Sequence, residues 1–230
     1  MLKFIKKAPL ILGIVCIDGI LLLAENSEKI TVSNYIDTKK IFPINSCSAV
    51  AATGQPGDFN RIIGRIRNDD KNNQAKFSNL LTGRKLSTKI SEIFHLHSIY
   101  WHLRPFACSL ILGTISAHSL ELFALLPTGV SSKCFTTAIG RNAYLLKLNL
   151  MTGITSLKSC RRNLNLISKY LIQIHKNYQL GTFEIQWYTK DSADFKKPYP
   201  SNLNHENDRK NKIFAEIIDE ELKRKQINAN

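Results

Sequence analysis

The chain has 230 residues, of which 43% are hydrophobic, so it is long enough to bury a complete core as one domain over residues 1–230. Its formal net charge of +14 is typical of proteins that bind nucleic acid or membrane surfaces. The basic residues are spread in short groups without a zinc finger or an aromatic RNA-binding motif, so a basic nucleic-acid-binding protein is kept only as an alternative.

The N-terminal region resembles a secretory signal, because three lysines within the first seven residues precede an apolar run over 9–24. Asp18 and Gly19 divide that run into strand-length pieces at 10–16 and 20–24, which predicts a buried β-hairpin. A charged residue in the middle of an apolar helix is costly, and the run is short for a membrane span. We therefore expect neither a cleaved signal nor a membrane anchor.

Two further strands are predicted at 39–45 and 47–53. Residues 57–77 then have apolar side chains at three- and four-residue spacing, which predicts an amphipathic helix. A second helix is predicted from an N-cap at Ser87 to residue 103. Its apolar face is expected to contain Ile90, Ile93, Phe94, His97 and Trp101.

In the second half of the chain, the spacing of apolar residues and the position of turn residues again predict the elements. Three strands are predicted at 107–115, 121–126 and 130–138. A short helix near 142–148, a longer helix over 156–177 and a strand at 182–189 come next. A polar loop over 191–210, which contains two prolines, precedes a C-terminal amphipathic helix over 211–225.

Strands and helices therefore come in blocks: four strands, two helices, three strands, two helices, a strand and a helix. This order favours antiparallel sheets covered by helices over an alternating parallel-sheet fold. We predict an α+β protein built as a four-layer αββα sandwich, in which two antiparallel sheets lie between two helical layers.

The five cysteines are odd in number, widely spaced and mostly set in apolar segments. This pattern is unlike a disulfide framework or a C-x-x-C zinc site. We expect free thiols in a reducing intracellular compartment, with no bound metal and no cofactor. The residues concerned are Cys16, Cys47, Cys108, Cys134 and Cys160.

Two other groups of residues have ordinary interpretations. His95 and His102 lie seven residues apart in the second predicted helix, but no Cys or carboxylate joins them at a metal-site spacing. We expect a packed or interfacial pair. The Gly54-Gln55-Pro56-Gly57 segment lacks the Lys-Ser/Thr of a phosphate-binding loop, which favours a plain strand-to-helix turn.

The segment Arg104-Pro105-Phe106 is the most specific of several short motifs in this chain. In their order and spacing these motifs resemble those of proteasome α subunits, in which an R-P-F-G segment leads into a central strand. The similarity covers residues 2–190. Other matching elements are Leu12-Gly13, Asp18-Gly19, Lys40-Ile41-Phe42, Leu122-Phe123, Pro127-Thr128-Gly129 and Ala138-Ile139-Gly140.

The resemblance implies the αββα architecture of N-terminal nucleophile hydrolases, which agrees with the order of blocks. Residues 104–109 and 183–187 are most similar to the α type-3 branch, called α7 in yeast. Leu126 replaces the Asp that is common in the family's D-P-x-G turn. Met1 aligns inside the family's Y-A-x-x-A-V segment, so the resemblance begins after the family's usual first helix.

The resemblance also bears on catalysis, because β-type relatives use an N-terminal Thr as nucleophile. It aligns Pro9 with that Thr, and proline has neither a hydroxyl nor a primary amine. Glu25 and Lys40 align with the acidic and lysine partners, and Arg141 stands where β subunits usually place a Ser. A base without a nucleophile catalyses nothing of this kind, so we expect no enzyme activity. A catalytic β-type threonine protease subunit is the alternative.

The resemblance implies a non-catalytic structural subunit of the 20S α ring, in the cytoplasm and nucleus. Its expected partners are other α subunits, β-ring subunits and the regulatory caps of ubiquitin-dependent degradation, without direct nucleic-acid or membrane contact. Lys40 is expected in the cap-binding pocket, because in the family the lysine of K-I-F binds the terminal carboxylate of a cap's tail. Lys39 points to the opposite face of the strand and is expected to matter less.

Overall fold

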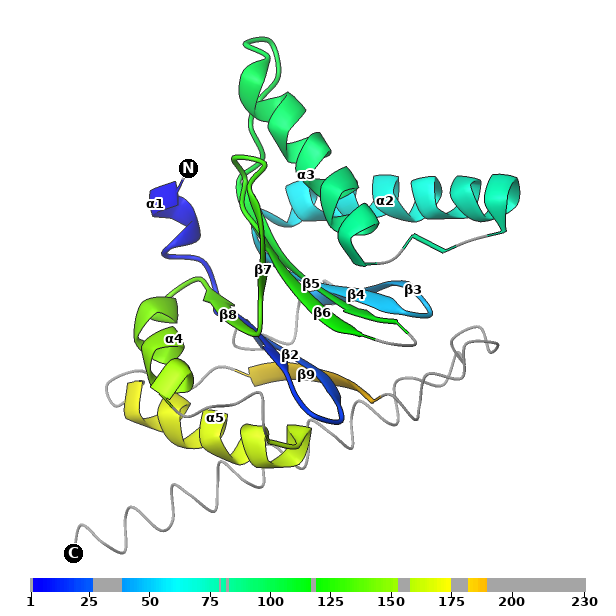
Figure 1. The fold of residues 1–230 in the computed structure, drawn as a ribbon. Coiled ribbons are helices and arrows are strands. Elements are labelled where there is room, and N and C mark those ends of the chain that lie inside the picture. Colours follow the sequence, from blue (N-terminus) through cyan, green and yellow to red (C-terminus); the bar gives the residue numbers. More distant parts are fainter. Residues whose placement is uncertain are drawn as a thin grey trace, which may run out of the picture.

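Two antiparallel sheets lie face to face between two layers of helices (Figure 1). The computed structural model describes residues 2–26, 39–78, 80–81, 83–116, 119–152, 158–174 and 182–189. Helices α2 (Pro56–Phe77) and α3 (Gly83–Ile99) cover one sheet, and α4 (Ala143–Thr152) and α5 (Cys160–Ile174) cover the other. A short helix, α1 (Leu2–Ile5), precedes the first strand. The predicted αββα sandwich is confirmed.

The sheet beneath α4 and α5 has the strand order β8-β1-β2-β9. Its strands are β1 (Ile11–Val15), β2 (Gly19–Asn26), β8 (Thr136–Ile139) and β9 (Thr182–Thr189). The predicted hairpin is thus confirmed as β1 and β2, paired antiparallel from Ile11 with Ala24 to Val15 with Ile20. The last predicted strand is confirmed as β9.

The apolar N-terminal run is explained by burial of β1 on both faces. Leu12 and Ile14 point into the core beneath α4 and α5, whereas Ile11 and Val15 point into the core between the sheets. A strand covered on both sides has no polar face, so its sequence reads as a continuous apolar segment. None of the described helices is both long and apolar enough to cross a membrane.

The second sheet, beneath α2 and α3, has the order β3-β4-β5-β6-β7. Its strands are β3 (Ile41–Asn45), β4 (Ser48–Gly54), β5 (Cys108–Ile115), β6 (Leu120–Leu125) and β7 (Ser131–Cys134). Gly13 allows the sheets to approach closely, because a Cβ there would lie 2.8 Å from Ile111 Cγ2 and 2.9 Å from Leu122 Cδ1. The sheet packing therefore depends on a missing side chain at this position.

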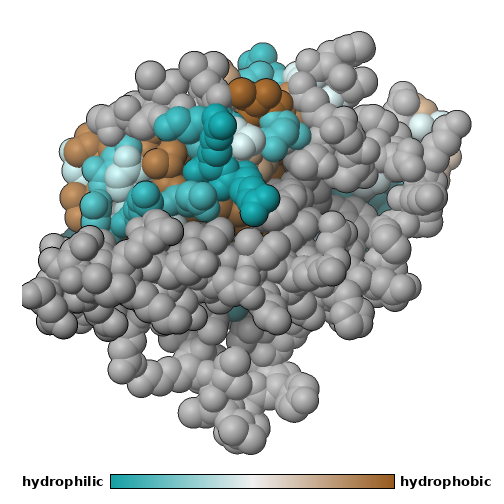
Figure 2. Space-filling view, turned by 90° about the horizontal axis from the view of Figure 1, so that it is seen from below, coloured by the Kyte–Doolittle hydropathy of each residue, from teal (hydrophilic) through white to brown (hydrophobic). Residues whose placement is uncertain are grey.

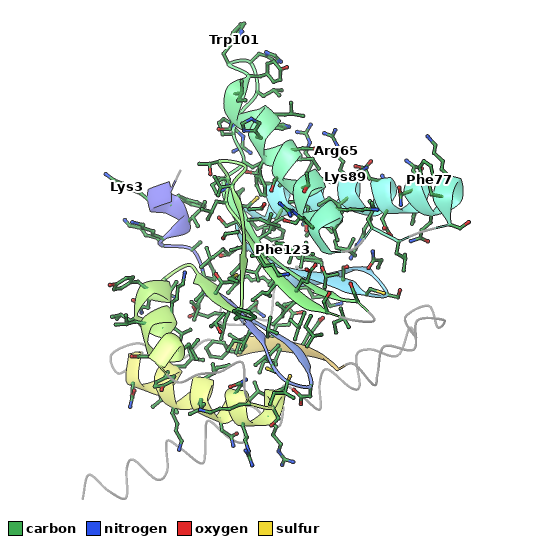
Figure 3. All side chains as sticks on the ribbon, viewed as in Figure 1. Lys3, Arg65, Phe77, Lys89, Trp101 and Phe123 are labelled. Atoms are coloured by element: carbon green, nitrogen blue, oxygen red, sulfur yellow. The ribbon has the colours of Figure 1, made fainter. Side chains whose placement is uncertain are left out.

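The apolar stripes of α2 and α3 pack on the second sheet as their spacing predicts. Phe59, Ile62 and Ile66 of α2 join Ile90 and Phe94 of α3 in one core. Phe123 of β6 points into the same core from the sheet (Figure 3). Burial of these apolar side chains away from water is the main source of stability for this layer.

The bounds of α3 differ from the prediction at both ends. The helix begins at Gly83, so Ser87 is not an N-cap but a buried residue inside it. Leu86 is fully buried in the core, and this packing extends the helix one turn toward its N-terminus. The helix ends at Ile99, so Trp101 leaves the apolar face and is 94% exposed.

The prediction of a single strand over 130–138 is wrong, because the chain changes sheets at Phe135. Residues before it form β7, which pairs with β6, and residues after it form β8, which pairs with β1. The carbonyl of Phe135 accepts a hydrogen bond from Val15 N–H at 2.8 Å, which marks the crossing point. Two short strands with different partners have the same extended sequence pattern as one longer strand.

Two helices of the second half also have different bounds. Helix α4 extends to Thr152, beyond the predicted 142–148, and α5 begins at Cys160, later than the predicted residue 156. Residues 156–157 and 175–177 lie outside the described residues. The predicted loop at 191–210 and helix at 211–225 also lie outside them, and they stay predictions.

Candidate functional site

Glu25, on β2, is the charged centre of the region where the family resemblance places a reaction site. Its side chain is almost fully buried, with the residue 2% exposed. Arg141 Nη2 donates to its Oε1 over 3.0 Å, and Leu10 N–H donates to its Oε2 over 3.1 Å. Both carboxylate oxygens thus have partners within the chain, which compensates the cost of burying the charge.

Arg141 reaches Glu25 from the junction between β8 and α4. The backbone N–H of Arg141 donates to Ala8 O over 2.8 Å, which holds this junction against the segment before β1. Gly140 has φ +115°, and a Cβ there would lie 2.4 Å from Pro9 O. Only glycine fits both the backbone conformation and the close approach. The A-I-G motif therefore has a structural reason at this position.

Pro9 lies beside this ion pair, where the resemblance aligns the nucleophile of the β-type relatives. Its carbonyl oxygen accepts a hydrogen bond from Thr53 Oγ1 over 2.6 Å. Its nitrogen is a tertiary amide bonded to Ala8, so it can neither attack a carbonyl nor accept a proton. The arrangement holds a carboxylate and cations in place but supplies no nucleophile from residue 9.

Lys40 joins the same cluster from the segment before β3. Its Nζ donates to the carbonyl oxygen of Glu25 over 2.8 Å. The Lys40 backbone N–H donates to Glu184 Oε2 over 2.7 Å, and Ile41 N–H donates to the same oxygen over 3.2 Å. Lys40 is half-buried, whereas Lys39 is exposed. The structure thus brings Pro9, Glu25 and Lys40 together, as their alignment implies.

Two members of this cluster were not predicted as partners. The alignment indicates Arg141 only as a replacement for Ser, whereas in the structure Arg141 pairs with Glu25. Glu184 of β9 was not singled out, although its carboxylate fixes the backbone at Lys40. Glu184 is the one charged residue of β9, and a charged residue in a strand of a covered sheet is a signal that could have indicated a partner.

The Arg104-Pro105-Phe106 motif has a structural role away from this cluster. The Arg104 guanidinium pairs with Asp58 in the first turn of α2, and Ala107 N–H donates to Asp58 Oδ2 over 2.7 Å. The ring of Phe106 lies 5.9 Å from that of Phe94 between centroids. The motif therefore joins the start of β5 to both helices above it.

The two histidines considered for a metal are separated by the end of α3. His95 is inside the helix, whereas His102 lies beyond Ile99. The His102 ring contacts Tyr100 and Trp101, with centroids 5.5 and 5.8 Å apart. The two histidines do not share a helix face, so the feature that suggested a metal pair is not present.

The chain matches a family model described as "Proteasome subunit" over residues 5–189. It is 25% identical over 203 residues to the proteasome subunit alpha type-3 of Spinacia oleracea, which covers 87% of this chain and 82% of the relative. The same subunit of Arabidopsis thaliana is 24% identical over 206 residues, with the same shares. The proteasome subunit alpha of the archaeon Methanosphaerula palustris is 27% identical over 143 residues, covering 61% and 59% of the two chains.

Proposed function

The chain belongs to the proteasome subunit family as a divergent α subunit, a structural component of the 20S α ring, and we propose that there it encloses the substrate chamber and docks regulatory caps. The pathway we propose is ubiquitin-dependent protein degradation in the cytoplasm and nucleus. The match over residues 5–189 carries this proposal, because it spans both sheets and both helical layers.

As an α subunit the chain is non-catalytic, and we propose that Pro9 is the chemical reason. The Glu25 carboxylate is neutralised by Arg141, and Thr53 Oγ1 donates a hydrogen bond to Pro9 O. The polar groups around the aligned position are thus engaged in interactions within the chain. Catalysis by this fold needs a free amine and a hydroxyl on the same residue, and proline offers neither.

Exposed apolar side chains support a role as one subunit among neighbours. Trp101 is 94% exposed beyond the end of α3, and Phe77 is 67% exposed at the end of α2; both project away from the sheets (Figure 3). Tyr144, Leu145 and Leu148 are exposed on α4. Large aromatic and aliphatic groups of this kind are typical of the buried centres of protein interfaces.

Seen from the α5 side, hydrophilic and hydrophobic residues are interspersed on the described part of the surface (Figure 2). Such a mixed surface suits contacts between protein subunits, which combine apolar anchors with a polar surround. We propose that the excess positive charge lies on protein-facing and solvated surfaces, because the basic residues form short groups without a nucleic-acid-binding motif.

Within this function, Lys40 is the proposed contact for the terminal carboxylate of a cap's tail. Its half-buried ammonium lies next to a main-chain carbonyl, so it is positioned rather than freely rotating. An ammonium has three N–H donors, and its charge strengthens a hydrogen bond to a carboxylate.

Co-purification tests the proposed function. The full chain, tagged at its C-terminus and expressed in cells, should be recovered in a particle of 20S size together with both α- and β-type subunits. A matched variant in which Trp101 is changed to Asp should be depleted from that particle while its fold, followed by circular dichroism, is retained. Recovery of the unmodified chain only as a free monomer or bound to nucleic acid would contradict the proposal.

A further inference from the structure

Two cysteines that are far apart in the sequence meet where β1 ends and α5 begins. Cys16 follows β1, Asp18 lies in the turn before β2, and Cys160 is the first residue of α5. Their three ligand atoms, two Sγ and one carboxylate oxygen, all lie within 4.8 Å of one another. Cys16 is 2% and Cys160 3% exposed, whereas Asp18 is partly open to solvent.

Hydrogen bonds hold these three side chains in place from both sides. The N–H of Cys160 donates to Asp18 Oδ1 over 2.9 Å, which orients the carboxylate toward α5. Asn163, buried in the first turn of α5, donates from Nδ2 to Cys16 Sγ over 3.1 Å. The Cys16 N–H donates to Gly19 O over 2.7 Å and closes the turn. The cluster is therefore positioned by the turn and the helix before any ligand binds.

The donor set selects the kind of ion. Two thiolates and a carboxylate suit Zn²⁺, whereas Mg²⁺ and Ca²⁺ take oxygen ligands. Zinc–sulfur bonds of about 2.3 Å in a tetrahedron place two sulfur atoms about 3.8 Å apart. The ligand atoms lie at most 4.8 Å apart, so the two sulfur atoms need to move toward each other by no more than about an ångström to bind zinc.

We propose that Cys16, Asp18 and Cys160 form a binding site for a thiophilic divalent cation, with Zn²⁺ as the best-matched ion. Each thiol releases its proton to solvent when it binds the ion. The fourth position takes a water molecule on the side where Asp18 is open to solvent, which is also the route by which the ion arrives. The bound ion fastens the β1–β2 turn to α5. Glu25 lies at the other end of β2, so this site is separate from its cluster.

Cobalt titration of the full chain tests the site. The protein is reduced, stripped with a chelator that is then removed, and titrated with Co²⁺ as a spectroscopic probe. We expect saturation at one equivalent, with a sulfur-to-cobalt charge-transfer band and the visible bands of tetrahedral Co²⁺, all abolished by one equivalent of Zn²⁺. Cys16→Ser and Cys160→Ser should each weaken binding more than about a hundredfold, and Asp18→Asn about tenfold.

Cys134 supplies the matched control, because it is another free cysteine, half-buried in β7 and outside this cluster. Cys134→Ser should leave the titration unchanged. Absence of the charge-transfer band in the unmodified chain would overturn the proposal. So would an unchanged titration in Cys16→Ser, or binding that saturates only at millimolar ion, which would indicate an adventitious ion only.

Because the serine variants can fail to fold, a second measurement uses the unmodified chain. Alkylation of the native protein, followed by mass spectrometry, should show that Zn²⁺ slows labelling of Cys16 and Cys160 at least tenfold and leaves Cys134 unaffected. Equal labelling with and without Zn²⁺ overturns the site. If the reduced chain takes up no ion and instead forms a Cys16–Cys160 disulfide in air, the pair is a redox pair and the metal site is wrong.

Discussion

Arg141 Nη2 lies 3.0 Å from Oε1 of Glu25 and so connects the turn after β8 to a carboxylate inside β2. The Glu25 side chain is 3% exposed, whereas that of Arg141 is 41% exposed. The carboxylate therefore depends on its partners for compensation of its burial, while the guanidinium is partly solvated. The ion pair fastens the β8–α4 junction to the first hairpin.

Arg141→Ala should lower the free energy of unfolding by about 1 to 3 kcal/mol, because it leaves one oxygen of a buried carboxylate without its cation. Urea denaturation measures the change. The double variant Arg141→Ala/Glu25→Gln should lose less stability than the sum of the losses of the two single variants. The reason is that the first substitution already removes the interaction. Arg161→Ala, an exposed arginine on α5, should change stability by less than about 0.5 kcal/mol. Equal effects of Arg141→Ala and Arg161→Ala would contradict a structural ion pair.

Asp58→Ala should destabilise the chain by about 2 to 4 kcal/mol, because Asp58 is buried and receives both the Arg104 guanidinium and the Ala107 N–H. Thermal unfolding followed by circular dichroism measures the loss. Asp69→Ala, about three turns further along α2, is the matched control and should cost less than about 1 kcal/mol. If the two variants unfold at the same temperature, the Arg-Pro-Phe motif is not held through Asp58.

Burial of Cys108 in β5 should make the chain less stable at alkaline pH. Loss of solvation raises the pKa of this thiol from 9.0 to about 12, with the nearby Asp58 carboxylate acting in the same direction. Above pH 9 the unfolded chain releases the proton while the folded chain keeps it, so stability falls as pH rises toward 12. The slope from one such group approaches about 1.4 kcal/mol per pH unit. Unfolding of Cys108→Ala should show a shallower decline over this window, and identical slopes would remove Cys108 as the cause.

The sequence was a good guide wherever local pattern and packing agree. The first hairpin was predictable because Asp18-Gly19 interrupts an apolar run that both cores bury. The start of α3 was not predictable. Ser87 is a residue type that often caps helices, but burial of Leu86 extends the helix N-terminally beyond Ser87. The change of sheets at Phe135 was also hidden, since it depends on pairing with β6 and β1.

The site was predictable only in part. The resemblance placed Pro9, Glu25 and Lys40 near one another, and the structure agrees. The pairing of Glu25 with Arg141 joins residues from different elements, and no local periodicity contains that information. The approach of Cys16 to Cys160 depends in the same way on how α5 docks on the first sheet.

Restoring a hydroxyl at the aligned position should not create a protease. In Pro9→Thr the new residue is still bonded to Ala8 through an amide, so it has no free amine to manage the proton. Arg141 also continues to neutralise Glu25. We expect the unmodified chain and Pro9→Thr to leave fluorogenic peptides intact at the level of buffer alone. Peptide hydrolysis, or a covalent adduct with an inhibitor of N-terminal threonine proteases on the unmodified chain, would contradict the assignment.

Lys40→Ala should weaken binding of regulatory caps to assembled particles without preventing assembly. The loss of a charge-assisted hydrogen bond to a terminal carboxylate is worth about 1.5 to 3 kcal/mol, or about ten- to a hundredfold in affinity. Lys40→Arg keeps the cation and should retain part of the binding. Lys39→Ala is the matched control, because Lys39 is adjacent but exposed.

Native gels establish that each variant enters particles, and pull-down of caps then measures the binding. Because Lys40 Nζ also contacts Glu25 O, Lys40→Ala loses an internal hydrogen bond, and its unfolding must be compared with that of Lys39→Ala. If cap binding is lost in Lys40→Ala and recovered in Lys40→Arg, the positive charge at residue 40 contributes to the binding, since both lysine and arginine can donate to a carboxylate. Equal cap recovery by Lys40→Ala and unmodified particles would remove Lys40 from the pocket.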